Sequence, residues 1–133
     1  MSKFIENLKS EHRKLFKLLE LCKKGQGIVG GEWKNDLFSA KNLFIGHLKK
    51  EDNSLYPELL KAAEKDTGLK KKTDKFIEDM KSISKKALAF FNQYTSVSAG
   101  TEFVRDYAEV EILLKSRMKQ EEENLFPEYE KLH

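Results

Sequence analysis

The chain has 133 residues, of which 39% are hydrophobic and 35% are charged, and its net charge is +3. This length and composition suit one domain, residues 1–133, with a sizeable apolar core, and they exclude a disordered chain. The small, evenly spread positive charge gives no indication of a nucleic-acid partner. The only cysteine, Cys22, excludes an intrachain disulfide. Because no segment resembles a signal peptide or a membrane span, we expect a cytoplasmic protein without a membrane partner.

Four segments repeat apolar side chains at alternating steps of three and four, which predicts four amphipathic helices. The first covers about residues 5–22 and the second about 37–55. The third is expected to begin near Thr73 as its N-cap, and the fourth near Thr101, after breaks near 65–72 and 95–100. Short connections make neighbouring helices antiparallel. We therefore predict an all-α fold, an antiparallel up-down-up-down four-helix bundle.

Five ionisable residues occupy positions of these apolar seams. They are His12, His47, Glu51, Arg117 and Glu121. Burying such groups costs several kcal/mol each unless they are paired or bind a metal. All lie midway or later along their helices, and the midpoints of antiparallel helices meet. We expect these side chains to converge at the centre of the bundle.

The second and fourth helices repeat one motif 70 residues apart: HLKKEDNSLYPE at 47–58 and RMKQEEENLFPE at 117–128. The repeat pairs Glu51 with Glu121 and His47 with Arg117. Residues four apart share one helix face, so His47 and Glu51 present a nitrogen and a carboxylate suited to iron, zinc or manganese. The proline near the end of each repeat is expected to loosen the backbone hydrogen bonding there.

With its repeated His-x-x-x-Glu…Leu-Tyr/Phe-Pro pattern and its Ser-Glu-His-Arg-Lys stretch at 10–14, the sequence resembles the hemerythrin-like (HHE cation-binding) family. The resemblance covers about residues 4–130. It implies a four-helix bundle around a non-haem di-iron centre, held by histidines from all four helices and two bridging carboxylates. It also implies oxygen binding, oxygen or iron sensing, or iron handling.

The resemblance makes His12 the first-helix ligand, His47 and Glu51 the second-helix ligands, and Glu121 the fourth-helix carboxylate. Two expected ligands differ from the family pattern. Arg117 replaces the fourth-helix histidine, and a guanidinium has no lone pair to give a metal. Met80 stands where the third helix should supply a histidine, and a thioether is a poor ligand for ferric iron. The metal site is therefore predicted to be incomplete, with iron as the family's expected cofactor.

Two interpretations of this centre follow. In one, two imidazoles and two carboxylates bind a single ion resembling Zn²⁺ or Fe²⁺. In the other, the core is metal-free, and Arg117 bridges Glu51 and Glu121 by charge-assisted hydrogen bonds. The leading hypothesis for function is a small binding, sensing or regulatory module without reversible oxygen carriage. The alternative is a metal-binding protein of oxygen or iron sensing and handling. No nucleophile-and-base pair or nucleotide motif indicates an enzyme, and no protein partner can be named.

Four residues outside the candidate ligands have predicted structural roles. Met80 and Cys22 are expected to pack as ordinary core, with Cys22 an inert buried thiol. Tyr107 is expected to pack with one hydrogen bond, the alternative being a hydroxyl that reaches the polar centre. Gly46, within the second helix, is expected to mark close helix approach beside His47.

Overall fold

The computed structural model describes residues 2–25, 33–96 and 101–132, and nearly all of them are helical. Helix α1 covers Lys3–Gly25. A second helical stretch joins α2 (Trp33–Lys50), the π-helical segment η1 (Glu51–Leu55) and α3 (Tyr56–Ala63). Helix α4 covers Thr67–Ser96. The last stretch joins α5 (Thr101–Gln120), the π-helical segment η2 (Glu121–Leu125) and α6 (Phe126–Glu130).

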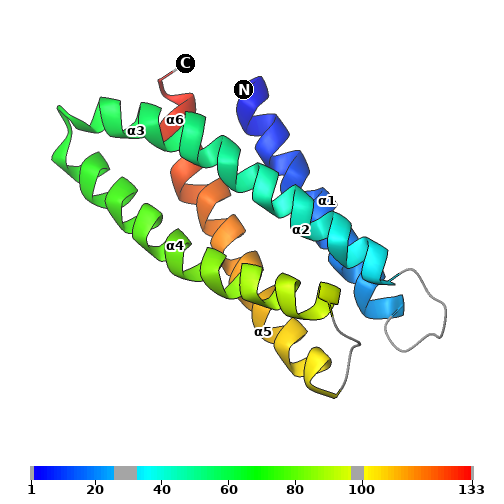
Figure 1. Cartoon of the computed structure of the whole chain (residues 1–133). Helices are drawn as coiled ribbons and strands as arrows, with labels where there is room; N and C mark the ends of the chain where they lie inside the picture. Colours follow the sequence, from blue (N-terminus) through cyan, green and yellow to red (C-terminus); the bar gives the residue numbers. More distant parts are fainter. Residues whose placement is uncertain (1, 26–32, 97–100, 133) are drawn as a thin grey trace.

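The four stretches run up and down side by side, as the sequence predicted, and the beginning of α1 lies at the same end of the bundle as α6 (Figure 1). The start of α5 at Thr101 is confirmed. None of the described helices is long and apolar enough to cross a membrane. The segment 26–32 between α1 and α2 lies outside the described residues, as does most of the predicted break at 95–100.

Helix α4 begins earlier than the sequence analysis placed it. The Asp66 side chain accepts a hydrogen bond from the backbone N–H of Leu69 at 3.1 Å, which caps the first turn. The prediction of Thr73 as N-cap is therefore wrong, because Thr73 is a buried residue inside the helix. The predicted break at 65–72 is also wrong beyond its first residues. Lys70, Lys71 and Lys72 belong to the first turns of α4, where Lys70 pairs with Asp74.

The apolar core consists of two clusters separated by a polar layer. One cluster lies toward the C-terminal ends of α1 and α4 and includes Leu15, Phe44, Phe91 and Leu114. The other lies toward the start of α1 and includes Leu8, Leu55, Leu59, Phe76, Leu125 and Phe126. Along each helical stretch, the residues between the two clusters are those that the sequence placed at the bundle centre. They are His12, His47, Glu51, Met80, Arg117 and Glu121, all buried.

Each of the two π-helical segments begins at a carboxylate of the polar layer. The Tyr56 N–H donates to the Glu51 carbonyl, and the Phe126 N–H donates to the Glu121 carbonyl, so both turns close over five residues instead of four. A proline follows each turn, at 57 and 127. In an α-helix the proline ring would clash with the carbonyl four residues earlier and leave it without a donor. A wider turn relieves that clash, which explains why both repeats contain one.

The structure confirms the predictions for Cys22 and Tyr107 but not the one for Gly46. Cys22 is fully buried, as predicted, and its burial raises the pKa of its thiol to about 12. The Tyr107 hydroxyl donates to Glu111 at 2.9 Å within the first apolar cluster, which confirms its structural role. The prediction for Gly46 is wrong, because a Cβ at that position would meet no atom within 4 Å.

Candidate metal centre

Four buried side chains from three helical stretches meet in the polar layer. Helix α1 supplies His12, and α2 supplies His47. Glu51 and Glu121 are the first residues of η1 and η2. One nitrogen or oxygen atom of each lies within 4.8 Å of the other three, and all four residues are at most 3% exposed. Every donor that the sequence analysis named is thus present in one cluster.

Two of the distances within this cluster match those between ligands of a single metal ion. The Nε2 atoms of His12 and His47 are 3.1 Å apart. The His47 Nε2 lies 3.4 Å from a Glu51 oxygen, and the His12 Nε2 lies 3.9 Å from a Glu121 oxygen. Two ligands about 2.1 Å from one ion are roughly 3.0 to 3.4 Å apart at octahedral or tetrahedral angles. The imidazole pair and the His47–Glu51 pair fall within or close to that range.

Two further carboxylates accept hydrogen bonds from the imidazole Nδ1 atoms, which face away from the cluster. The His12 Nδ1 lies 2.8 Å from Glu122, and the His47 Nδ1 lies 2.9 Å from Glu11, which also pairs with Lys50. Because a carboxylate accepts, each Nδ1–H donates, and the lone pair of the neutral ring is then on Nε2, inside the cluster. Such partners fix the tautomer and orientation of metal-binding histidines in proteins.

Glu11 was not among the site residues predicted from the sequence. It precedes His12 and therefore points away from the α1 seam, toward α2. Its position next to the seam could have indicated this contact, because a residue beside the seam of one helix lies close to the neighbouring helix.

Burial disfavours charge at the centre. Burial, and then the charge of His47, lower the pKa of His12 to about 4. Burial raises the pKa of Glu51 to about 7. It also raises the pKa of Glu121 well above its ordinary value, and the neighbouring Glu51 carboxylate adds to that effect. The protein part of the cluster thus carries two carboxyl groups that resist ionisation unless a cation joins them.

The predicted bridge from Arg117 to the two carboxylates is wrong. The Arg117 Nη2 donates to the Phe76 backbone carbonyl at 2.6 Å, and the guanidinium lies over the Phe76 ring, 4.0 Å from its centroid. Within the described part of the chain, no side chain or backbone group other than the two carboxyl groups themselves hydrogen-bonds the carboxyl oxygens of Glu51 and Glu121. Stacking on an aromatic face and a carbonyl acceptor satisfy Arg117 without the carboxylates. The metal-free network therefore loses its central interaction.

Met80 lies in the polar layer but belongs to neither apolar cluster. It is the residue of α4 at this level, and it lines a groove beside α2 together with Leu48 and Tyr56. Its side chain is 5% exposed, so Met80 is buried core, as expected.

A comparison with protein families agrees with this geometry. The family model of the hemerythrin HHE cation-binding domain matches residues 3–129. The chain belongs to this hemerythrin family. No curated protein and no solved structure was found to match it.

The hemerythrin pattern of the centre is only partly kept. Unpartnered carboxyl oxygens beside two inward-facing imidazole nitrogens fit one divalent ion with mixed nitrogen and oxygen ligands. They do not fit the family's di-iron centre, which draws histidines from all four helices. Arg117 and Met80 stand where the additional histidines would be, and neither supplies a suitable ligand.

Proposed function

We propose that this hemerythrin-family protein binds one divalent transition-metal ion, with iron as the leading candidate, and acts as a small binding or sensing module. His12, His47, Glu51 and Glu121 hold the ion. When bound, the ion supplies a Lewis-acid centre that can accept an additional ligand. The proposal includes neither reversible oxygen carriage at a di-iron centre nor catalytic turnover.

The arrangement of the two imidazoles carries the proposal. Each is fixed from outside by a carboxylate, so that both Nε2 lone pairs converge at 3.1 Å. Two neutral lone pairs at this distance repel each other unless a proton or a metal lies between them. A proton is disfavoured, since burial lowers the pKa of His12 to about 4. A metal ion also neutralises the two buried carboxyl groups of Glu51 and Glu121.

The position of Arg117 supports one ion instead of two. Its guanidinium exerts an electrostatic effect on both Glu51 and Glu121 from the α4 side of the centre. A second divalent cation on that side would be repelled by this fixed positive charge. Arg117 thus partly offsets the charge of the carboxylates while one ion offsets the rest.

Metal analysis tests this proposal. The protein is expressed in medium supplemented with iron, and bound iron, manganese and zinc are measured by mass spectrometry. We expect close to one ion per chain, and His47→Gln should lose it while Glu123→Gln, a change at an exposed position outside the centre, keeps it. Added metal should raise the stability of the metal-free protein by about 2.7 kcal/mol at a hundredfold excess over Kd. Two ions per chain, or none, would contradict the proposal.

The sensing role needs a separate measurement. Metal binding should slow amide hydrogen exchange in η1 and η2, because these π-helical turns carry the two carboxylates and have fewer regular helix bonds. Equal exchange with and without metal would leave a storage or structural role and refute sensing through these turns.

A further inference from the structure

The two imidazoles of the centre have different surroundings on their outer sides. The His12 Nδ1–H donates to Glu122, a carboxylate of η2 whose side chain is 37% exposed. The His47 Nδ1–H donates to Glu11, a carboxylate of α1 whose side chain is only 13% exposed. Each ring is therefore oriented by one acceptor, but the two acceptors differ in their exposure and in their other contacts.

Glu11 is shared between a buried donor and an exposed one. Its Oε1 accepts from His47 at 2.9 Å, and its Oε2 accepts from the ammonium group of Lys50. Lys50 is the last residue of α2, and its side chain is half exposed. In contrast, Glu122 has no ion pair with a lysine or an arginine in the described part of the chain. A cation thus shares the acceptor of His47 but not that of His12.

The Lys50 charge reduces the electronic effect of Glu11 on His47. A carboxylate that accepts from Nδ1–H shifts electron density through the imidazole toward Nε2, which makes Nε2 a better metal ligand. An ammonium group on the second carboxylate oxygen draws negative charge away from the first, because both donors compete for the charge of one carboxylate. The His47 ring is therefore supported less strongly as a ligand than its hydrogen bond to Glu11 alone suggests.

The repeated motif indicates that the wide turn itself does not need this lysine. The segments HLKKE and RMKQE share their first lysine, as Lys49 and Lys119, but Lys50 corresponds to Gln120. Both repeats nevertheless form a π-helical turn that begins at the next residue. Glutamine is thus compatible with the backbone at this position, and the contact that distinguishes the lysine is its bond to Glu11.

We infer that Lys50 is a positioning residue that, acting through Glu11 and His47, holds the affinity of the centre for its metal ion below the value that the four ligands would otherwise give. The inference rests on the single-ion site proposed above. Lys50 contacts none of the four ligands and acts by competing with His47 for the Glu11 carboxylate. Because Lys50 is exposed, an anionic partner that pairs with it tightens metal binding from outside the bundle. A centre restrained in this way releases its ion more readily, which suits a sensing module.

The affinity for iron(II) of a series of Lys50 variants tests the inference, measured without oxygen in competition with a chromogenic chelator. Lys50→Gln should bind iron(II) about three- to tenfold more tightly than wild type, a fraction of the effect of a complete carboxylate partner. Lys50→Arg keeps the charge and should match wild type. In a Glu11→Gln background, Lys50→Gln should have no effect, because the acceptor that transmits the charge is gone.

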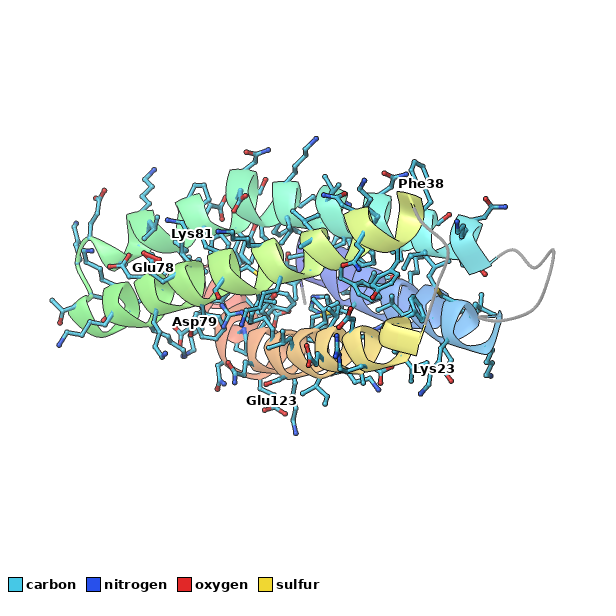
Figure 2. The ribbon with its side chains drawn as sticks, turned by 60° about the horizontal axis from the view of Figure 1, so that its bottom comes forward. Lys23, Phe38, Glu78, Asp79, Lys81 and Glu123 are labelled. Carbon is cyan, nitrogen blue, oxygen red and sulfur yellow. The ribbon has the colours of Figure 1, made fainter. Side chains whose placement is uncertain are left out.

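Two exposed lysines control for the change in net charge. Lys49→Gln removes a positive charge one residue away, and Lys81→Gln removes one on α4 (Figure 2). Neither lysine pairs with Glu11, whose cation partner is Lys50. Each control should change the iron(II) affinity by less than about twofold, because solvent and salt screen exposed charges.

The metal-free protein provides a readout that a purely structural role would not change. The proton resonance of the His47 Nδ1–H should move downfield in Lys50→Gln, because its hydrogen bond to Glu11 becomes stronger when the competing donor is removed. The same resonance should stay in place in Lys49→Gln. An unmoved resonance in Lys50→Gln would overturn the inference.

The outcomes separate this inference from the proposed function. One ion per chain, bound more tightly in Lys50→Gln but not in Lys49→Gln, supports both. One ion per chain, with unchanged or weaker binding in Lys50→Gln, overturns the role of Lys50 but not the metal site. Weaker binding would show that the lysine only holds Glu11 in place. Absence of bound metal in wild type overturns both.

Discussion

Replacing Glu51 by methionine should stabilise the metal-free protein while removing metal binding. Burial raises the pKa of Glu51 from its ordinary value of 4.5 to about 7. Below pH 4.5 the carboxyl is protonated in both the folded and the unfolded state, so it does not affect stability. Between pH 4.5 and 7 only the unfolded state ionises, which lowers the free energy of unfolding as the pH rises. Above pH 7 the accumulated loss is about 3 kcal/mol, at about 1.4 kcal/mol for each pH unit between the two pKa values.

The assay is urea unfolding of chelator-treated wild type and Glu51→Met at pH 5 and pH 8. We expect the variant to be more stable by about 3 kcal/mol at pH 8, or roughly 10 °C in Tm, and nearly equal to wild type at pH 5. In the presence of saturating metal the order should reverse at pH 8, because only wild type is stabilised by the ion. Glu123→Met, at an exposed position, is the control. Equal destabilisation of Glu51→Met at both pH values would refute the reasoning, since it would show that the carboxyl is stably paired in the metal-free fold.

Three more predictions concern the surroundings of the centre. Glu11→Gln and Glu122→Gln should each weaken metal affinity by about 10- to 100-fold in a competition assay with a chelator, because each removes a carboxylate that orients an imidazole; unchanged affinity would show that packing alone fixes the rings. Cys22 should react with a thiol reagent only at the rate of unfolding, since it is buried and its thiolate is disfavoured, and fast labelling of the native protein would contradict this. Arg117→His combined with Met80→His should raise the iron content above that of wild type if the backbone still follows the family pattern, and an unchanged iron content would show that more than two side chains separate this centre from a di-iron site.

The four candidate donors could be predicted from the sequence because burial follows helical phase. His12, His47, Glu51 and Glu121 interrupt apolar seams, and a residue on a seam must point into the bundle whatever its chemistry. Their convergence then follows from the antiparallel packing of neighbouring helices. The direction of a long side chain after it enters the core does not follow from phase. Arg117 was placed correctly in the polar layer, but its guanidinium turns to the Phe76 ring and carbonyl instead of the carboxylates.

The start of α4 was missed for a different reason. Residues 65–72 were predicted to form a break, although the Asp66 side chain accepts a hydrogen bond from the Leu69 N–H and caps a helix there. Helix ends depend on single capping interactions, whereas helix interiors depend on many seam residues. The interior of α4 was therefore predicted correctly while its first turns were not.

The spacing of the buried residues could have predicted the π-helical turns. In the second stretch the buried residues include the series 47, 51, 55, 59 and 63, and in the fourth the series 117, 121, 125 and 129, each in steps of four, with Tyr56, Met118 and Phe126 buried beside them. An α-helix turns about 400° in four residues, so such a series drifts about 40° at each step and would soon leave the core. One wide turn absorbs most of that drift, and the proline that follows makes it favourable. An unbroken run of steps of four that ends near a proline is thus a usable indication of a π-helical turn.

The two repeats have the same backbone conformation but differ in the side chains that they place at the centre. Their wide turns start at equivalent carboxylates, and the next aromatic residues, Tyr56 and Phe126, are both buried at the layer's edge. Phe126 covers the His12 ring, whereas Tyr56 brings a hydroxyl toward Arg117. Where one repeat has the imidazole of His47, the other has the permanent cation of Arg117. The symmetric frame therefore presents an imidazole on one side of the centre and, on the other, a guanidinium that has no lone pair to give a metal.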